Sequence, residues 1–326
     1  MIRVVLADTP STASSSSSPI PYPSFFTMTI EQLNVDYGTN GIQFKAGKAD
    51  FPLIDIDNGS ATATISLYGG QVLAFQPKGE PEPLLFLSDN AYYQTGKAIK
   101  GGVPVCWPWF GPDPEDKGRP SHGFVRNRLW RVVKTETIGD TTTVVLGVSA
   151  SEETQAIWPY SFDLTIEISV GSSLSIALIT RNTGDRPFRI TQALHTYFTV
   201  GDISQVAVVG LDGADYIDKV DGGAQKSQSG HVTVNQEVDR IYLDVPPELV
   251  IEDGALGRKV HVTSSGSKTA VVWNPWSEIS AKSGDLTEDA YQSMICVETT
   301  NAATDVVQVQ PQSEFRLTAT YHIARG

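Results

Sequence analysis

The chain has 326 residues, 40% of them hydrophobic, and a formal net charge of −13 at pH 7. This length accommodates one large all-β domain or two ordinary domains. An acidic chain has no broad positive field, so we expect neither nucleic acid nor a membrane as a partner. No apolar run approaches the roughly 18–20 residues of a membrane helix, and we expect a cytoplasmic protein.

The N-terminal 27 residues differ in composition from the rest. They contain an unbroken run of serines from 14 to 18 and prolines at 19, 21 and 23. The apolar piece Ile2–Ala7 is shorter than the roughly 7–15 apolar residues of a secretory signal. We expect a disordered Ser/Pro-rich tail over 1–27, with a transit peptide as the alternative, followed by a single domain over 28–326.

From about residue 53, short segments alternate between apolar and polar residues, which is typical of strands. We expect strands over 61–68, 71–76, 130–137, 141–148, 162–170, 174–181, 189–199, 205–210, 231–235, 248–253, 258–264, 269–273, 293–299 and 314–323. Helix signals are scarce, with a turn or two expected within 281–292. About fifteen short strands without a change of composition predict an all-β protein, a large antiparallel β-sandwich in one domain.

The stretch from 96 to 112, GKAIKGGVPVCWPWFGP, is the most unusual part of the sequence. Its prolines exclude a regular helix, and its paired glycines allow a close backbone approach or a positive φ. Trp107, Trp109 and Phe110 are rigid aromatic surfaces of the kind that line sugar pockets. The stretch is therefore a candidate for one wall of a binding site.

Cations surround these aromatic residues. Seven lie between 97 and 131, against three carboxylates: Lys97, Lys100, Lys117, Arg119, Arg126, Arg128 and Arg131, with Asp113, Glu115 and Asp116. In an acidic chain, a local excess of positive charge predicts a small bound anion. A structural loop with solvated charges is the alternative.

Two further residues carry possible proton chemistry. His195 lies in QALHTYF (192–198), where strand alternation puts it on one face with Ala193 and Tyr197. Imidazole titrates near neutral pH, so His195 is either a general acid in a cleft or a satisfied core histidine. Glu298 ends the apolar segment MICVE, and it is either a general base of raised pKa or a strand-end residue that points to water.

Asp239 precedes another expected strand in EVDRIY (237–242). Its carboxylate is placed to accept hydrogen bonds from a polyol, or to pair with Arg240 on the surface. His195, Glu298 and Asp239 do not have the spacing of a metal site, so we expect no metal. Cys106 and Cys296 are the only cysteines, which excludes a disulfide scaffold and a four-cysteine zinc site.

These motifs together resemble the hexose-6-phosphate mutarotases (glucose-6-phosphate 1-epimerases) of the aldose 1-epimerase superfamily. The resemblance runs from about residue 50 to 322 and is carried by ordered segments: KGGVPVCWPWFG (100–111), HGFVRN (122–127), ALHTYF (193–198), EVDRIY (237–242), WNPW (273–276) and MICVE (294–298). It implies a galactose-mutarotase-type β-sandwich with the site in a cleft on one sheet. It also implies no cofactor, and we expect a monomer that binds a small-molecule sugar phosphate.

The resemblance also implies roles for individual residues. His195 matches the general acid and Glu298 the general base. Lys100 and Arg126 match positions that serve the sugar phosphate, and Asp239 matches one that binds sugar hydroxyls. We place two more residues of these segments, Ser121 and His122, among the substrate-binding candidates.

Three departures from the family pattern accompany these matches. Lys100 stands where arginine is usual, which keeps the charge but loses the bidentate fork. Ser121 stands where some members have glutamine, and Thr299–Thr300 follow Glu298 where Pro-Gly is common. The expected activity is interconversion of the α and β anomers of an aldohexose 6-phosphate. A mutarotase of unphosphorylated aldoses and a non-catalytic carbohydrate-binding β-sandwich are the alternatives.

Overall fold

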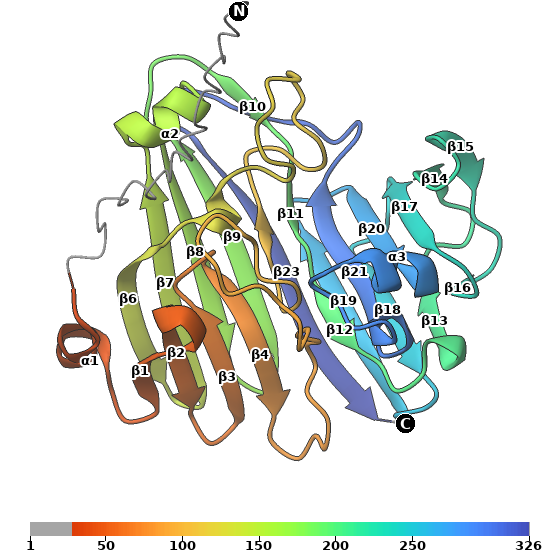
Figure 1. The fold of residues 1–326 in the computed structure, drawn as a ribbon, viewed down its shortest axis with the longest axis horizontal. Helices are drawn as coiled ribbons and strands as arrows, with labels where there is room; N and C mark the ends of the chain where they lie inside the picture. The colour runs from red at the N-terminus through yellow and green to blue at the C-terminus, as the bar shows by residue number, and fades with distance from the viewer. Residues whose placement is uncertain (1–27, 326) are drawn as a thin grey trace, which may run out of the picture.

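The computed structural model describes residues 28–325, so the tail expected over 1–27 lies outside the described residues. Antiparallel strands make up most of the fold (Figure 1). Within the described residues the strands are β1 (Ile42–Ala46), β2 (Pro52–Asp57), β3 (Ala61–Ser66), β4 (Gln71–Pro77), β5 (Val105–Cys106), β6 (Arg131–Ile138), β7 (Thr141–Ser149), β8 (Phe162–Val170), β9 (Leu174–Asn182), β10 (Phe188–Ile190), β11 (Gln192–Leu194), β12 (Tyr197–Thr199), β13 (Val206–Val209), β14 (Asp215–Asp218), β15 (Ala224–Ser227), β16 (Val232–Thr233), β17 (Val238–Leu243), β18 (Glu248–Asp253), β19 (Arg258–Ser265), β20 (Thr269–Asn274), β21 (Met294–Asn301), β22 (Val307–Val309) and β23 (Glu314–Arg325).

Helices are short and lie between strands. They are α1 (Ile30–Tyr37), α2 (Glu152–Ile157) and α3 (Trp276–Lys282), with single turns η1 (Lys48–Asp50), η2 (Val125–Asn127), η3 (Ile203–Gln205) and η4 (Ala290–Gln292). The helical turns expected within 281–292 correspond to the end of α3 and to η4. Among the described residues, no helix is both long enough and apolar enough to span a membrane.

Two layers of sheet form the sandwich. The back layer is a nine-stranded sheet in the order β16-β13-β18-β19-β23-β9-β8-β7-β6. The front layer contains the four-stranded sheet β1-β2-β3-β4 and an eight-stranded sheet in the order β15-β14-β17-β20-β21-β11-β5, to which β12 adds by pairing with β21. Contacts of β3 with β8 and of β21 with β23 join the layers. The predicted all-β sandwich is confirmed.

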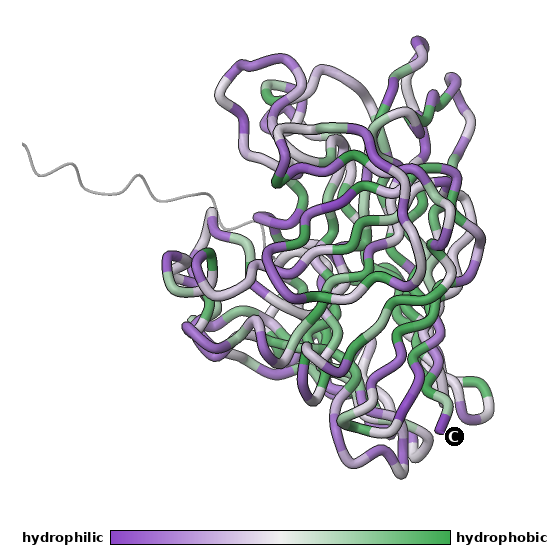
Figure 2. The backbone as a smooth tube through the Cα atoms, turned by 90° about the vertical axis from the view of Figure 1, so that its right-hand side faces the viewer, coloured by the Kyte–Doolittle hydropathy of each residue, from purple (hydrophilic) through white to green (hydrophobic). Residues whose placement is uncertain are grey.

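The core lies between these layers and follows from the strand period of two. In β8, the alternating residues Phe162, Leu164, Ile166, Ile168 and Val170 are all buried. Figure 2 shows hydrophobic residues concentrated along the strands and hydrophilic residues in the outer connections. Alternation of this kind is the signal on which the strand prediction was based, and it places most long strands within a residue or two of their observed bounds.

The strand expected over 189–199 differs from the structure. It is divided into β10, β11 and β12, with breaks at Thr191 and at His195–Thr196. The segment changes pairing along its length: β10 pairs with β22, whereas β11 and β12 both pair with β21. His195 therefore occupies an interruption between two short strands that face the same neighbour.

Strand β21 is buried on both faces, and all eight of its residues are buried. Ile295 and Val297 face the core between the layers. Met294 and Cys296 face the opposite side, as does Glu298, because alternate residues of a strand project to opposite faces. The first four residues of β21 are apolar and the last four are polar, and Glu298 is the one acidic residue among them.

Candidate active site

The outer face of the eight-stranded sheet brings the predicted residues together. Cross-strand register aligns Asp239 with Trp273, Trp273 with Cys296, and Cys296 with Tyr197. Directly opposed residues of antiparallel strands project to the same side. These four side chains therefore form one row on the face that also carries Glu298.

The backbone of the 96–112 stretch fixes the position of His195. Leu194 pairs with Val105, and the His195 N–H donates to the Pro104 carbonyl at 3.0 Å. Gly102 lets the same stretch pack closely on β4: its φ is +61°, and a Cβ there would lie 2.1 Å from the Val72 carbonyl oxygen. The glycine-rich segment is thus a structural wall that holds the histidine against β21.

The side chains of His195 and Glu298 face each other. His195 Nδ1 lies 3.4 Å from Glu298 Oε1, and the two side chains are 12% and 1% exposed. Neither His195 Nδ1 nor Glu298 Oε2 has a hydrogen-bond partner among the described residues. Buried polar atoms without partners are costly, so these two atoms are candidates to bind a polar ligand.

Burial sets the protonation of this pair. It raises the pKa of Glu298 well above its usual value, an effect that the charge of Asp239 strengthens and Arg126 opposes. Burial lowers the pKa of His195 well below its usual value, and His122, Arg126 and Lys100 lower it further. Both directions favour the uncharged pair, a carboxylic acid beside a neutral imidazole.

Aromatic and apolar side chains form the floor around the pair. The ring of His195 stacks on Tyr197 with centroids 4.9 Å apart and meets Trp273 edge-on at 6.0 Å. Tyr197, Met294 and Cys296 form a small buried cluster beside them. The low dielectric of this floor is the physical cause of the opposite pKa shifts of His195 and Glu298.

Asp239 lies within β17, whereas the sequence predicted a position just before that strand. Burial raises the pKa of its carboxyl to about 6, and the nearby Lys219 opposes this shift. The alternative of a surface pair with Arg240 is wrong, because Arg240 instead contacts Gln228 and Tyr242. The carboxylate is half-buried on the site face, where it can accept hydrogen bonds from a ligand.

His122 stands at the edge of the pair with a strained backbone, at φ +61°. Its Nδ1 accepts the Gly111 N–H at 3.3 Å, so the neutral ring carries its proton on Nε2. Burial, together with Arg126 and Lys100, lowers its pKa to about 3. Its ring meets that of His195 edge-on at 5.8 Å. His122 is therefore a neutral hydrogen-bond donor beside the acid–base pair.

Lys100 points toward the same face but already has an acidic neighbour. Its Nζ lies 3.4 Å from Asp285 Oδ2 and 5.9 Å from the centre of the Trp273 ring. The segment that carries Asp285 is fixed: Ser88 Oγ donates to the Asp285 carbonyl, and the Asn90 amide donates to that of Leu286. Asp285 was not among the predicted residues.

Arg126 makes no ion pair with a carboxylate in the described part of the chain. Its Nη2 donates to the Ser121 carbonyl at 3.0 Å, and its Nε is buried without a partner. Ser121 is exposed and orients Arg126 through its backbone oxygen. Of the seven cations between 97 and 131, Lys100, Lys117, Arg119 and Arg128 pair with carboxylates, so Arg126 is a cation of the site face without such a partner among the described residues.

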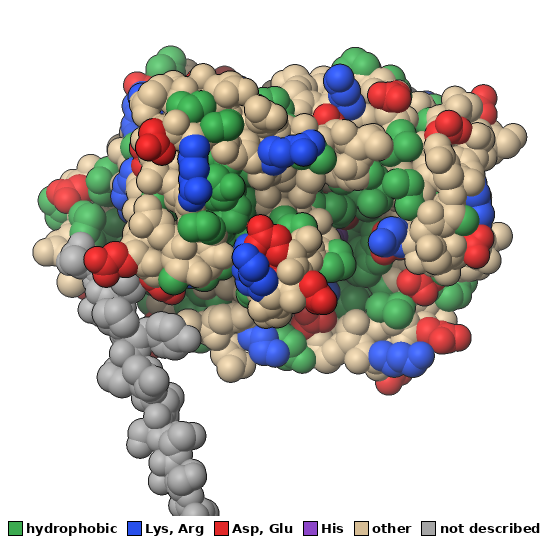
Figure 3. All heavy atoms as spheres, turned by 90° about the horizontal axis from the view of Figure 1, so that it is seen from above, with side chains coloured by type: hydrophobic (Ala, Val, Ile, Leu, Met, Phe, Trp, Pro, Cys, Tyr) green, Lys and Arg blue, Asp and Glu red, His purple; other side chains and the backbone are tan. Residues whose placement is uncertain are grey.

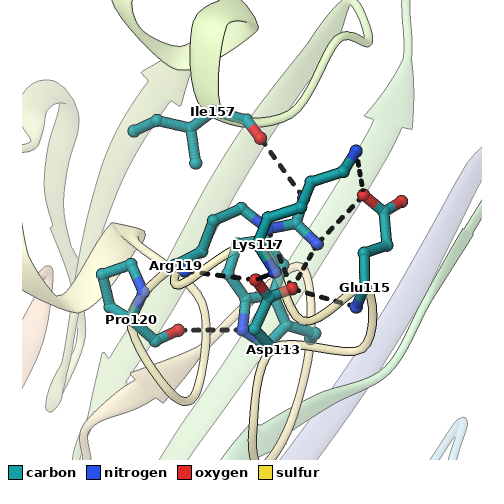
Figure 4. A network of polar contacts seen from close by, with 7 residues as sticks. Asp113, Glu115, Lys117, Arg119, Pro120 and Ile157 are labelled. Carbon is teal, nitrogen blue, oxygen red and sulfur yellow. Dashed lines mark hydrogen bonds and ion pairs between the residues drawn. The ribbon is translucent and has the colours of Figure 1, made fainter.

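The loop from 111 to 121 is closed by its own polar network (Figure 4). Asp113 accepts hydrogen bonds from the backbone N–H groups of Glu115, Lys117 and Arg119 and from the Arg119 guanidinium. Arg119 also lies over the Trp109 ring, 4.4 Å from its centre. The predicted alternative of solvated charges is therefore wrong for Asp113 and Arg119, whose side chains are only 6% and 10% exposed.

Seen from above, the molecule is hollowed, with hydrophobic side chains inside the hollow and Lys and Arg side chains around it (Figure 3). Another groove, of about 770 Å³, is lined by the α1–β1 connection and by β2 to β4. None of the predicted site residues line this groove, so the candidate site is identified by the chemistry of its side chains and not by the volume of a groove.

Two details of β21 could not be read from the motif alone. Thr299 and Thr300 continue the strand past Glu298 to Asn301 and pair with β11, whereas a proline there would lack the N–H of a ladder bond. Cys296 joins the histidine and the glutamate: one donor atom from each of His195, Cys296 and Glu298 lies within 4.8 Å of the others. This group contains Cys296 in place of Asp239, the residue that was considered with His195 and Glu298 as a metal ligand on the basis of the sequence.

Comparisons with known proteins agree with this arrangement. The family model described as aldose 1-epimerase matches residues 52–322. A protein of Escherichia coli (strain K12), provisionally named glucose-6-phosphate 1-epimerase, is 39% identical over 255 residues, which cover 78% of this chain and 84% of that protein. Its namesake in Salmonella typhimurium is 37% identical over 277 residues, which cover 85% of this chain and 92% of that protein.

Among solved structures, a provisionally named mutarotase from Salmonella typhimurium is similar throughout. Its TM-score is 0.83 at 36% sequence identity, and the match covers 88% of this chain and 95% of that chain. The match therefore extends well beyond the two short segments that carry His195 and Glu298.

Proposed function

The chain belongs to the aldose 1-epimerase family, and from that membership we propose that it interconverts the α and β anomers of an aldohexose 6-phosphate, most directly glucose 6-phosphate. Two relatives at 39% and 37% identity carry the name glucose-6-phosphate 1-epimerase, which supports the phosphorylated substrate. The observation that carries the proposal is the buried His195–Glu298 pair, in which His195 Nδ1 and Glu298 Oε2 have no hydrogen-bond partner among the described residues.

Ring opening requires two proton transfers. The anomeric hydroxyl loses a proton as the ring oxygen gains one, so that the bond between C1 and the ring oxygen breaks and a free aldehyde forms. In the proposed mechanism Glu298 takes the first proton and His195 donates the second. The aldehyde then rotates about its C1–C2 bond, and closure on its other face reverses both transfers. The pair thus ends each turnover in the state in which it began.

The pair must hold one proton in total for this cycle. With the sugar ring closed, the reactive arrangement is ionised Glu298 beside protonated His195. With the ring open, it is the uncharged arrangement that burial favours. Sugar hydroxyls and the charge of Arg126 stabilise the carboxylate in the first arrangement. The protein therefore stabilises the open-chain state, which lies between the two anomers.

Other residues hold the sugar in place. Asp239 accepts hydrogen bonds from sugar hydroxyls, and neutral His122 donates one through Nε2. Trp273 offers an apolar face for the ring. Arg126 and Lys100 contact the phosphate, with Arg126 supplying most of the charge because Lys100 is paired with Asp285. Binding of a remote dianion positions the reacting end of the substrate.

Two-dimensional exchange NMR tests the proposal. Glucose 6-phosphate at anomeric equilibrium is measured with and without the protein, with plain glucose measured in parallel. Protein-dependent cross-peaks between the anomers of the phosphate ester support the proposed reaction. The absence of enhancement for either sugar, with binding still detected by line broadening, would instead indicate a carbohydrate-binding protein without this activity.

One observation favours a second candidate, a mutarotase of unphosphorylated aldoses. Asp285 neutralises Lys100, and this leaves the phosphate position with less positive charge than the sequence implies. The same NMR experiment separates the two candidates, because equal enhancement for glucose and its phosphate ester would favour the second.

A further inference from the structure

Three donor atoms of different chemistry converge at the bottom of the site. One ring nitrogen of His195, the Sγ of Cys296 and a carboxylate oxygen of Glu298 lie within 4.8 Å of one another. Cys296 and Glu298 are two residues apart on β21 and therefore project to the same side, and His195 reaches them from the break between β11 and β12. Backbone pairing, rather than flexible loops, sets this arrangement.

Nitrogen, thiolate sulfur and carboxylate oxygen form a ligand set that suits zinc. Tetrahedral zinc with three protein ligands and one water places its ligand atoms about 3.5 Å apart, given the usual zinc–ligand distances. His195 Nδ1 and Glu298 Oε1 are already 3.4 Å apart. The remaining separations, up to 4.8 Å, require a contraction of about an ångström, which a rotation of the side chains supplies.

Two atoms of this group point independently to a ligand. His195 Nδ1 and Glu298 Oε2 are buried and have no hydrogen-bond partner among the described residues. A sugar satisfies them in the proposed reaction, and a metal ion satisfies them equally well. The two ligands would therefore compete for the same atoms.

The charges around the group set the limits of such binding. Arg126 and Lys100 lie near enough to act on the pKa of the site residues, and they oppose a dication. Ionised Glu298 and the Cys296 thiolate would supply two negative charges that match the ion. The thiol proton must leave to solvent as zinc binds, because only the thiolate is a ligand.

We propose that His195, Cys296 and Glu298 form an inhibitory zinc site, in which Zn²⁺ occupies the place of the reacting end of the sugar. The competition rests on the proposed function, whereas binding of the metal does not. Zinc therefore acts on this protein as a competitive inhibitor, and Cys296, which has no step in the proton transfers, confers the sensitivity.

The chain offers a matched control for a test, since Cys106 is its only other cysteine. Both thiols are buried, but Cys106 lies on β5 and is not part of the donor group. Binding is measured first, without reference to activity, by titrating the protein with Co²⁺ as a spectroscopic substitute for zinc. Wild type and Cys106→Ala should show a thiolate-to-cobalt charge-transfer band and tetrahedral d–d bands, and Cys296→Ala and Cys296→Ser should show neither.

Calorimetric titration with Zn²⁺ then gives the affinity, with circular dichroism to establish that each variant is folded. We expect Cys296→Ser to weaken zinc binding at least tenfold, and Cys106→Ala to leave it within twofold of wild type. Equal zinc affinity in the folded Cys296 variants would overturn the proposal, as would a cobalt spectrum without a thiolate band in wild type.

The final measurement is exchange NMR of glucose 6-phosphate with increasing Zn²⁺, each variant being compared with its own zinc-free rate. Inhibition that is relieved by more substrate, and that Cys296→Ser weakens, supports the site as inhibitory. Zinc bound through Cys296 with no effect on an active enzyme would overturn the inhibitory role. A protein that binds zinc but lacks anomerase activity without it would count against the proposed function and leave the metal site standing.

Discussion

His195 Nδ1 lies 3.4 Å from Glu298 Oε1, although the two residues come from distant parts of the sequence and only one of them lies in a regular strand. Both short strands that flank His195 pair with the strand that carries Glu298. β11 and β12 pair with β21 in one register, in which His195 lies opposite Glu298, and directly opposed residues of antiparallel strands project to the same side. The shared neighbouring strand, rather than the break itself, therefore brings the imidazole and the carboxyl group together.

The first prediction concerns Glu298→Gln. Glutamine preserves the shape of the side chain but accepts no proton, so we expect the protein-dependent anomerisation rate to fall about 10²–10⁴-fold. Binding of glucose 6-phosphate, followed by line broadening, should persist. Glu314→Gln, an exposed carboxylate on β23, is the control and should keep the wild-type rate. Turnover that survives in Glu298→Gln would remove Glu298 from the mechanism.

The pH dependence provides a second prediction. If Glu298 and His195 had their ordinary pKa values of 4.5 and 6.5, the pair would lose its last proton above pH 6.5, and no proton would remain for transfer to the ring oxygen. Burial raises the pKa of Glu298 instead, so one proton should remain at higher pH. We expect the alkaline fall of kcat/KM, after subtraction of the buffer rate, to begin above pH 6.5. A fall that is already complete at pH 6.5 would contradict the raised pKa.

Arg126→Ala should weaken the binding of glucose 6-phosphate much more than the binding of glucose. A hydrogen bond to a charged group contributes about 1.5–3 kcal/mol, so KM for glucose 6-phosphate should rise roughly 10- to 100-fold, with little change for glucose. Lys100→Ala should have a smaller effect because Asp285 already pairs with Lys100. Lys97→Ala is a nearby control, since its ammonium lies over the Tyr92 ring. Equal losses for both sugars would argue against a phosphate role.

Asp239→Asn should raise the free energy of unfolding while it weakens the binding of the sugar. The carboxyl has a pKa of about 6 in the folded protein against a usual 3.8. Ionisation therefore costs the folded state about 3 kcal/mol at most, because each tenfold loss of acidity corresponds to about 1.4 kcal/mol. The gain in unfolding free energy should be complete above pH 6 and absent below 3.8, where both states are protonated. Denaturant unfolding at pH 8 and 3.5 measures it, and an equal effect at both would contradict this origin.

Asp113→Asn tests the closed loop. The carboxylate loses its charge and its paired contact with Arg119, whose guanidinium holds the pKa of Asp113 well below its usual value. We expect faster cleavage by trypsin after Lys117, and a higher KM for glucose 6-phosphate. Asp116→Asn, on the exposed part of the loop, should change neither.

Much of the fold and the proximity of His195 to Glu298 could be predicted because the signals in the sequence are local. Alternation over eight or nine residues defines strands such as β8 and β9, and the motifs around His195 and Glu298 identify the pair. Short strands such as β5, with two residues, contain too little alternation to be recognised. Helix α2 could have been found, since Ser151 and Thr154 form a capping box.

The electrostatics of the site were less predictable, because they depend on contacts between distant segments. Sequence counting gives seven cations around the aromatic stretch, but Asp285 and Glu153 reach them from elsewhere in the chain. The sequence also did not determine whether the Glu298 side chain is exposed to water, because its burial depends on which residues cover the outer face of β21. Tyr197 and Trp273 provide that cover, and no pattern near Glu298 announces them.

The burial of β21 on both faces has a consequence for motion. Its backbone bonds to β20 on one side and to β11 and β12 on the other, so its amide hydrogens should exchange with solvent only when the whole protein unfolds. The exposed loop that carries Asp116 and Ser121 can open on its own at a smaller cost in free energy. The position of Glu298 is therefore as stable as the fold itself, whereas the loop that ends at Ser121, a hydrogen-bond partner of Arg126, can fluctuate independently of it.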